Sequence, residues 1–160
     1  SVVNRGKKDT CLVERTFVEL AKQHPFFEVE YTQDSRTAIT GENLAKADIA
    51  ETTIAGGGHL SVQVLNEFVS VARRKAGLDW REIDEVLGSV RQMCRVHSLT
   101  VETHDAARGL AQKYDLGFYD ASIVASALLA GCDVLLSEDM QDGQRFDQAL
   151  QVQNPFRVGR

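Results

Sequence analysis

The chain has 160 residues, of which 43% are hydrophobic and 26% charged, and it carries a formal net charge of −5. This composition is ordinary for a soluble globular protein, and the length suits one domain with a full hydrophobic core. The negative charge argues against a protein that grips nucleic acid over its whole surface, so any such contact must be local or carried by metal ions.

We expect a cytoplasmic protein. The longest apolar stretch, residues 121–132, is interrupted by Ser122 and Ser126 and is much shorter than a membrane-spanning helix. Residues 1–8 carry basic side chains without an apolar block of signal-peptide length. The three cysteines lie far apart without a Cys-x-x-Cys pair, which predicts three reduced thiols.

The first 43 residues are the least regular part of the chain. A helix is predicted from Cys11 to about Lys22, and the alternating residues 27–31 predict a half-buried strand. We expect residues 1–43 to be a divergent part of the same domain that can supply its first strand. Residues 44–150 then form the main body, and residues 151–160 form a C-terminal tail or an edge strand.

From Leu44 onward, helices and strands alternate. The apolar spacing and the capping residues predict five helices, at 44–53, 63–76, 79–93, from Thr100 or Thr103 to Tyr114, and 119–130. Short apolar runs predict strands at 60–62, 94–99 and 133–136. This order predicts an α/β fold, a three-layer α/β/α sandwich with a mainly parallel central sheet.

The stretch 117–142 reads as a helix, a tight turn and a strand. A helical projection puts Asp120 near the middle of the buried face of the helix. The strand ends just before three polar residues, Ser137, Asp139 and Asp142. In an open α/β sheet, this carboxyl edge is where ligands bind.

Five carboxylates are candidates for a shared site: Asp34, Glu67, Asp120, Asp139 and Asp142. Each alone has an ordinary reading as a turn, cap or surface residue. Converging at one edge of a parallel sheet, however, they would repel one another unless a cation lay among them. Oxygen ligands without His or Cys select Mg²⁺ or Mn²⁺, and such a site suits phosphodiester hydrolysis by a metal-activated water. Ser137 is either a hydrogen-bonding support of Asp139 or a plain turn residue.

Other reaction types lack their motifs. The four histidines are scattered without the His-Glu-x-x-His spacing of a zinc hydrolase, and there is no Gly-x-Ser-x-Gly elbow to supply a nucleophile. The only dense basic cluster is Arg73, Arg74 and Lys75, in the last turn of its predicted helix. It is read equally well as a nucleic-acid contact or as a set of partners for the helix dipole.

Residues 44–146 resemble PIN-domain nucleases, in particular the VapC-type toxins of bacterial type II toxin–antitoxin systems. The resemblance rests on Leu60-Ser61-Val62-Gln63-Val64-Leu65-Asn66-Glu67-Phe68, on Tyr119-Asp120-Ala121-Ser122-Ile123-Val124-Ala125-Ser126-Ala127, and on Leu135-Leu136-Ser137-Glu138-Asp139-Met140-Gln141-Asp142-Gly143. It implies an Mg²⁺-dependent endoribonuclease that acts on structured RNA such as tRNA, is inhibited by a cognate antitoxin, and is commonly a homodimer.

The resemblance also implies roles for particular residues. Glu67 corresponds to the second acid of the family and Asp120 to the third. Ser137 and Asp139 correspond to the strand-end motif, with Asp142 as the neighbouring last acid.

The family's first motif, an apolar strand running into Asp-Thr/Ser-Asn, is absent in clean form. Asp34, followed by Ser35-Arg36, is the nearest substitute, and Asp9, followed by Thr10-Cys11, is its competitor. This departure leaves a second hypothesis open, that of a catalytically degenerate PIN module acting as a protein-binding or dimerising scaffold.

Overall fold

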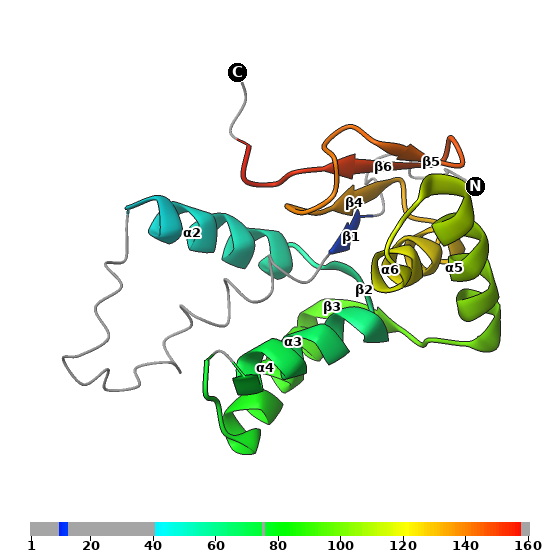
Figure 1. Cartoon of the computed structure of the whole chain (residues 1–160). Coiled ribbons are helices and arrows are strands. Elements are labelled where there is room, and N and C mark those ends of the chain that lie inside the picture. The colour runs from blue at the N-terminus through cyan, green and yellow to red at the C-terminus, as the bar shows by residue number, and fades with distance from the viewer. Residues whose placement is uncertain (1–9, 13–40, 75, 158–160) are drawn as a thin grey trace, which may run out of the picture.

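The structure is a computed structural model that describes residues 10–12, 41–74 and 76–157. Its centre is a sheet of six strands: β1 (Thr10–Leu12), β2 (Gly58–Ser61), β3 (Cys94–His97), β4 (Val134–Leu136), β5 (Arg145–Phe146) and β6 (Leu150–Gln153). The strands lie in the order β3-β2-β1-β4-β6-β5 (Figure 1). All neighbouring pairs are parallel except β5 and β6, so the predicted mainly parallel sheet is confirmed.

The described helices are α2 (Gly41–Ala55), α3 (Val62–Arg74), α4 (Trp80–Met93), α5 (Val101–Tyr114) and α6 (Phe118–Leu129). α5 and α6 pack against each other on one side of the sheet, and α2 lies on the other side (Figure 1). α3 and α4 lie near the β3 end of the sheet, where α4 contacts both β3 and α2. The predicted α/β/α sandwich is therefore confirmed.

Capping side chains fix where two helices begin. Asp79 Oδ1 accepts from the Glu82 amide at 2.9 Å, and Glu82 Oε2 accepts from the Asp79 amide at 2.7 Å. Thr100 and Thr103 form the same reciprocal arrangement at the start of α5. These side chains satisfy amides that the first helical turn leaves without partners, so α5 starts from Thr100 rather than Thr103.

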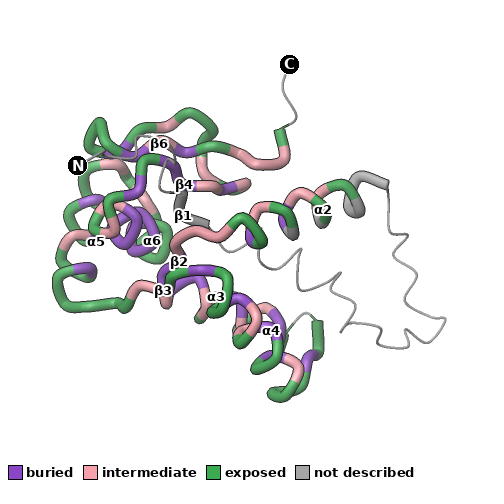
Figure 2. Tube along the Cα trace, turned by 180° about the vertical axis from the view of Figure 1, so that it is seen from behind, coloured by how far each residue is buried: buried purple, intermediate pink, exposed green. Residues whose placement is uncertain are grey.

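The core is built around α6. Residues 121–127 of this helix are all buried (Figure 2), because the sheet covers one of its sides and α5 covers another. Phe68 of α3, Leu135 of β4 and Phe146 of β5 each have 0% exposure and belong to the same hydrophobic cluster. Burial on this scale is the main stabilising contribution to such a fold. It also holds the ends of α3, α6 and β4 in fixed positions.

The structure corrects two predictions, the helix that begins at Cys11 and the edge strand near the C-terminus. The helix predicted from Cys11 is wrong at its start, because residues 10–12 form β1, which pairs with β2 and with β4. The short apolar run is used as a central strand, where pairing on both sides outweighs local helix propensity. The strand predicted at 27–31 lies outside the described residues. β6 lies inside the sheet between β4 and β5, and the edge beyond it is the two-residue strand β5, which the sequence reading missed.

The cysteine prediction holds only in part. Cys94 is a free, buried thiol, and burial raises its pKa. Cys132 is disulfide-bonded, so the expectation of a reduced thiol is wrong there. Among the helices of the described ranges, none combines the length and the apolar character needed to cross a membrane.

Candidate active site

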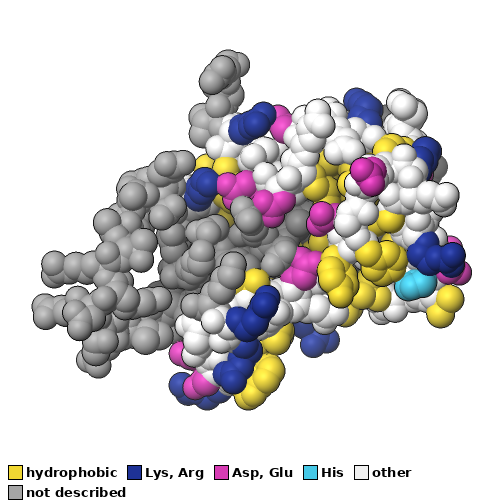
Figure 3. Space-filling model, in the orientation of Figure 1, with side chains coloured by type: hydrophobic (Ala, Val, Ile, Leu, Met, Phe, Trp, Pro, Cys, Tyr) yellow, Lys and Arg dark blue, Asp and Glu magenta, His cyan; other side chains and the backbone are white. Residues whose placement is uncertain are grey.

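A cavity of about 630 Å³ lies between α3 and the first turn of α6. Its lining includes Glu67 and Asp120, together with Gln63, Asn66 and Arg74. In Figure 3, acidic side chains run across the middle of the face that is turned to the viewer, and hydrophobic side chains lie beside them toward α5 and α6. Two of the predicted acids therefore meet in one cavity although they come from different helices.

Glu67 is held in place by its own helix. Val64 and Phe68 face the core and are fully buried, so Glu67, beside that stripe, is half-buried at the rim. Gln63, one turn earlier, donates a hydrogen bond from Nε2 to Glu67 Oε1 at 2.8 Å. This pair orients the carboxylate across the cavity.

Asp120 lies in the first turn of α6 and is exposed, so its predicted position on the buried face is wrong. The seven residues after it are all buried, so the helix has no distinct polar face, and the projection assigned Asp120 to the buried stripe. Partial burial of the carboxyl group raises the pKa of Asp120 from its ordinary value of 3.8, and the negative charges of Glu67 and then Asp139 raise it further. Glu67 and Asp139 therefore each lie close enough to Asp120 to disfavour its charged form.

Asp139 is exposed in the loop that follows β4. Ser137, only 1% exposed, accepts hydrogen bonds at Oγ from the amides of Asp139 and Met140, at 3.2 and 3.1 Å. The Ser137 amide itself donates to the carbonyl of Gln153 in β6. Ser137 therefore fixes the main chain that carries Asp139 through two backbone amides, which is the behaviour of the turn residue that was one of its two predicted readings.

Asp142 is engaged elsewhere. Its Oδ1 accepts from the Asn154 amide at 2.9 Å, and its Oδ2 pairs with Arg157 Nη1 at 3.5 Å. It is not part of the lining of the cavity that holds Glu67 and Asp120. In this arrangement, the Asp142 carboxylate ties the loop after β4 to the segment that follows β6.

The two candidates for the first acid, Asp34 and Asp9, lie outside the described residues. The position of β1 nevertheless bears on them. β1 begins one residue after Asp9 in the sequence, and it ends at Leu12, which pairs with Leu136 of β4. The first acid after the carboxyl end of β1 in the sequence is Glu14, which the sequence reading had included in a helix.

A family model of the PIN domain matches residues 37–145. The chain belongs to the PIN-domain family. Among curated proteins, none matches this sequence significantly.

Two solved structures share the fold of this PIN domain. A toxin–antitoxin complex from Klebsiella pneumoniae superposes with a TM-score of 0.63 at 12% identity, over 94% of this chain and 100% of that one. Mycobacterium tuberculosis VapC20, described as a Sarcin-Ricin loop cleaving toxin, superposes with a TM-score of 0.56 at 16% identity, over 82% of this chain and 92% of that one.

The donor set of this PIN domain fits a hard divalent cation. Glu67 and Asp120 offer carboxylate oxygens to one cavity, with Asp139 near enough to raise the pKa of Asp120. Within the ranges that the structure describes, no three His, Cys, Asp or Glu side chains form a group able to hold a metal ion. The acids that are described nevertheless match Mg²⁺ or Mn²⁺ rather than zinc, because each donor is oxygen.

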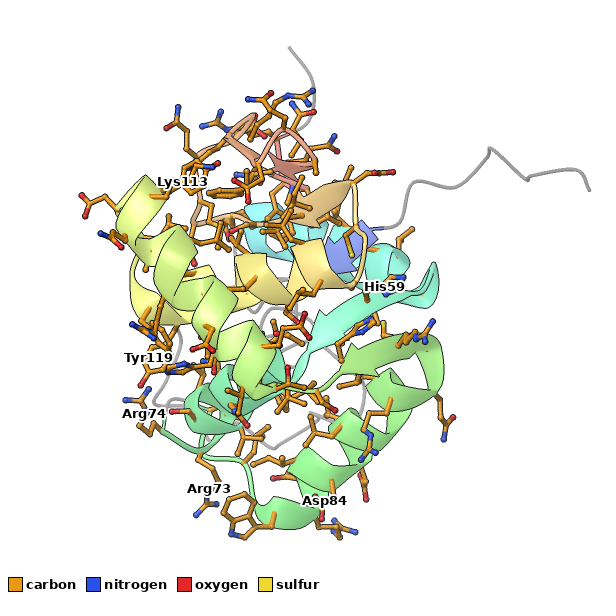
Figure 4. All side chains as sticks on the ribbon, turned by 90° about the vertical axis from the view of Figure 1, so that its right-hand side faces the viewer. His59, Arg73, Arg74, Asp84, Lys113 and Tyr119 are labelled. Carbon is orange, nitrogen blue, oxygen red and sulfur yellow. The ribbon has the colours of Figure 1, made fainter. Side chains whose placement is uncertain are left out.

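The basic cluster divides into residues with different surroundings. Arg73 donates from Nη1 to the Leu78 carbonyl at 2.7 Å and lies over the Trp80 ring at 4.9 Å, so it stabilises the turn between α3 and α4. Arg74 is exposed and lines the acidic cavity (Figure 4). Lys75 lies outside the described residues. Of the two described arginines, Arg74 is therefore the one placed to meet a substrate.

Sequence reasoning missed two features of the site. Gln63, which holds Glu67, was recognised only as part of a motif, although its spacing of four residues on a helix signals contact. The aromatic residues Phe118 and Tyr119, which also line the cavity, were passed over because they directly precede Asp120 in the chain. Their exposure depends on how α6 meets α5, and a single-helix pattern does not contain that information.

Proposed function

We propose that this PIN domain is a metal-dependent endoribonuclease and the toxin component of a bacterial type II toxin–antitoxin pair. The observation that carries the proposal is that Glu67 and Asp120 line one cavity from two different helices, with the charges of Glu67 and Asp139 raising the pKa of Asp120. Such crowding is costly in a metal-free protein and becomes useful when a divalent cation binds. The likeness in fold to a toxin–antitoxin complex and to an RNA-cleaving toxin supports the same function.

In this proposal, Glu67, Asp120 and Asp139 would hold Mg²⁺ or Mn²⁺ together with a further acid, since the described residues alone do not form a metal-holding group. A bound cation supplies positive charge beside the phosphodiester and polarises a water for attack. Gln63 keeps the Glu67 carboxylate turned toward the cavity through its 2.8 Å hydrogen bond. Asp120 must lose its proton before it binds a cation, and Ser137 holds the loop that carries Asp139. Arg74 contacts a phosphate of the RNA next to the cavity.

We further propose that a first acid joins this set, with Asp34, Asp9 and Glu14 as the candidates in the sequence. Parallel strands bring their carboxyl ends to one edge of a sheet, and Leu12 of β1 pairs with Leu136 of β4. Asp139 follows Leu136 by three positions in the sequence and Glu14 follows Leu12 by two, whereas Asp9 precedes β1. The order along the sequence therefore makes Glu14 a candidate beside Asp34 and Asp9, all three of which lie outside the described residues.

The remaining parts of the proposal concern partners. A cognate antitoxin that covers the acidic cavity would silence the enzyme, and the likeness to a toxin–antitoxin complex over nearly the whole chain supports such a partner. A tRNA substrate, a homodimer and a cytoplasmic location are further proposals that come from the family resemblance.

The test is cleavage of structured RNA by purified, antitoxin-free protein. With Mg²⁺ or Mn²⁺, the protein should yield discrete products on a denaturing gel, and EDTA should abolish them. Glu67→Gln and Asp120→Asn should each reduce the rate by at least about 100-fold. Asp84→Asn is the matched control, because Asp84 is an exposed acid on α4 that does not line the cavity. If the metal-loaded wild-type protein cleaves no RNA of a broad pool, the scaffold hypothesis replaces the nuclease.

A further inference from the structure

A second cavity, of about 440 Å³, adjoins the acidic one. The two cavities share three lining residues, Gln63, Phe118 and Tyr119. The second cavity also has Leu99 and Val101 in its lining, so its wall is mainly apolar. An acidic hollow and an apolar hollow are thus continuous across the first turn of α6.

Aromatic rings form the boundary between the two hollows. Phe118 is 40% exposed and Tyr119 is 67% exposed, so both rings are accessible to a ligand beside Asp120. Phe118 meets His104 of α5 edge-on at 5.3 Å and Tyr119 at 6.4 Å between ring centroids. The rings of His104, Phe118 and Tyr119 therefore lie next to one another in space, and they present faces and edges to solvent immediately beside Asp120.

Charge and polar groups complete the surface. Tyr119 and Arg74 lie side by side at the rim (Figure 4), and both line the acidic cavity. Gln63 lines both hollows, and its Nε2 donates a hydrogen bond to Glu67 Oε1. The surface thus offers stacking faces, a cation and an amide within a short reach of the acids.

We infer that the apolar cavity between Phe118, Tyr119 and His104 is a stacking site for an unpaired nucleobase next to the cleaved phosphodiester. The inference rests on the proposed nuclease function and specifies its substrate as single-stranded or looped RNA. Bases in a duplex are stacked on their neighbours, so a side-on aromatic platform takes only a nucleotide that is splayed out.

The alternative occupant is an apolar side chain of a partner protein. The continuity of the two hollows favours the nucleotide, because one nucleotide unit carries both a flat apolar base and a phosphodiester. The base suits the rings, and the phosphodiester suits a cation held by acids, with Arg74 beside it. An apolar side chain would use only one of the two hollows.

The experiment measures binding of a 12-nucleotide single-stranded RNA that carries one 2-aminopurine. Asp120→Asn serves as the background, because the proposed mechanism makes it inactive and the RNA stays intact. We expect 2-aminopurine fluorescence to change on binding. Adding Tyr119→Ala should remove this change and weaken affinity roughly 5- to 160-fold, the equivalent of about 1–3 kcal/mol for one stacked base. Tyr119→Phe should keep both, since the ring is retained.

Leu129→Ala is the control, because Leu129 is an apolar residue on the same helix with 50% exposure and lines neither hollow. It should leave fluorescence and affinity unchanged, and the same RNA annealed to its complement should bind more weakly. Cleavage by the wild type together with unchanged affinity in Tyr119→Ala and Phe118→Ala would overturn the stacking site while the nuclease stands. Equal affinity for duplex would also overturn it. Wild-type protein that neither cleaves nor binds RNA would instead remove the nuclease proposal and this inference with it.

Discussion

Asp120 and Glu67 line one cavity from two different helices, and the charge of Glu67 disfavours the charged form of Asp120 and so raises its pKa. Partial burial raises the pKa of Asp120, and the negative charges of Glu67 and Asp139 raise it further. A proton or a cation relieves this repulsion, and the choice between them depends on pH and on the metal concentration.

The repulsion predicts that the metal-free protein gains stability from Asp120→Asn at neutral pH. A carboxyl whose folded pKa is raised binds protons more readily in the folded state, so stability falls as pH rises from 3.8 through that raised pKa. Asp120 is exposed, so solvent limits the gain to less than about 1 kcal/mol, or roughly 2–4 °C in Tm. Thermal unfolding in EDTA at pH 7 measures it, and below pH 3.8 the difference should vanish. Added Mn²⁺ should stabilise the wild type more than the variant, and equal stabilisation of the two would contradict this prediction.

The two arginines at the end of α3 should behave differently on mutation. Arg74→Ala should weaken RNA binding and reduce the slope of log affinity against log salt by about 0.7, the value for one phosphate contact on a single strand. Arg73→Ala should mainly lower stability, by about 1–2 kcal/mol, because it loses the Leu78 carbonyl and the Trp80 ring. Binding isotherms at several salt concentrations, with urea unfolding of both variants, measure the two effects. An unchanged salt slope in Arg74→Ala would exclude Arg74 from the RNA site.

Ser137→Ala should damage both stability and activity. It removes the acceptor of two amides at a position that is 1% exposed, which costs about 1–3 kcal/mol and loosens the loop that carries Asp139. Ser89→Ala is the control, since the Ser89 hydroxyl only donates to a carbonyl one turn back on exposed α4 and Ala suits a helix. Urea unfolding and RNA cleavage rates measure the effect. A stable Ser137→Ala protein with full activity would show that Ser137 does not support the site.

The sequence predicted most of the fold because several elements carry local signals. Asp79 with Glu82 marks the start of α4, and the alternation of helices with short apolar strands predicted a parallel sheet. The carboxylate pair at the cavity was also predictable, since the ends of parallel strands and the helices that follow them share one edge. The exposure of Asp120 was not predictable, because the helix after it is buried on every side and has no distinct polar face.

The strand β1 was missed because its local sequence, like that of the helix after Asp120, carries no pattern that identifies its surroundings. A strand of three residues carries almost no periodic signal, and its identity depends on pairing with β2 and β4, which come much later in the sequence. The available signal was in the sequence alone, where the short run Cys11-Leu12-Val13 is followed by the acid Glu14.

Separate substitution of Glu14 and Asp34 distinguishes the two candidates for the first acid. Glu14→Gln should reduce RNA cleavage by at least about 100-fold if Glu14 is the first acid, because a neutral amide binds a divalent cation poorly. Asp34→Asn should then leave the rate within about threefold of the wild type. Cleavage rates of the two variants at saturating Mn²⁺ decide between them, and the reverse pattern would restore Asp34.

The most direct measurement is isothermal titration calorimetry of Mn²⁺ binding to the full chain. The account predicts that the wild type binds Mn²⁺, that Glu67→Gln and Asp120→Asn each weaken binding at least about tenfold, and that Asp84→Asn leaves it unchanged. Wild-type protein that takes up no Mn²⁺, or equal affinity in all four proteins, would contradict the claim that these carboxylates form a cation site.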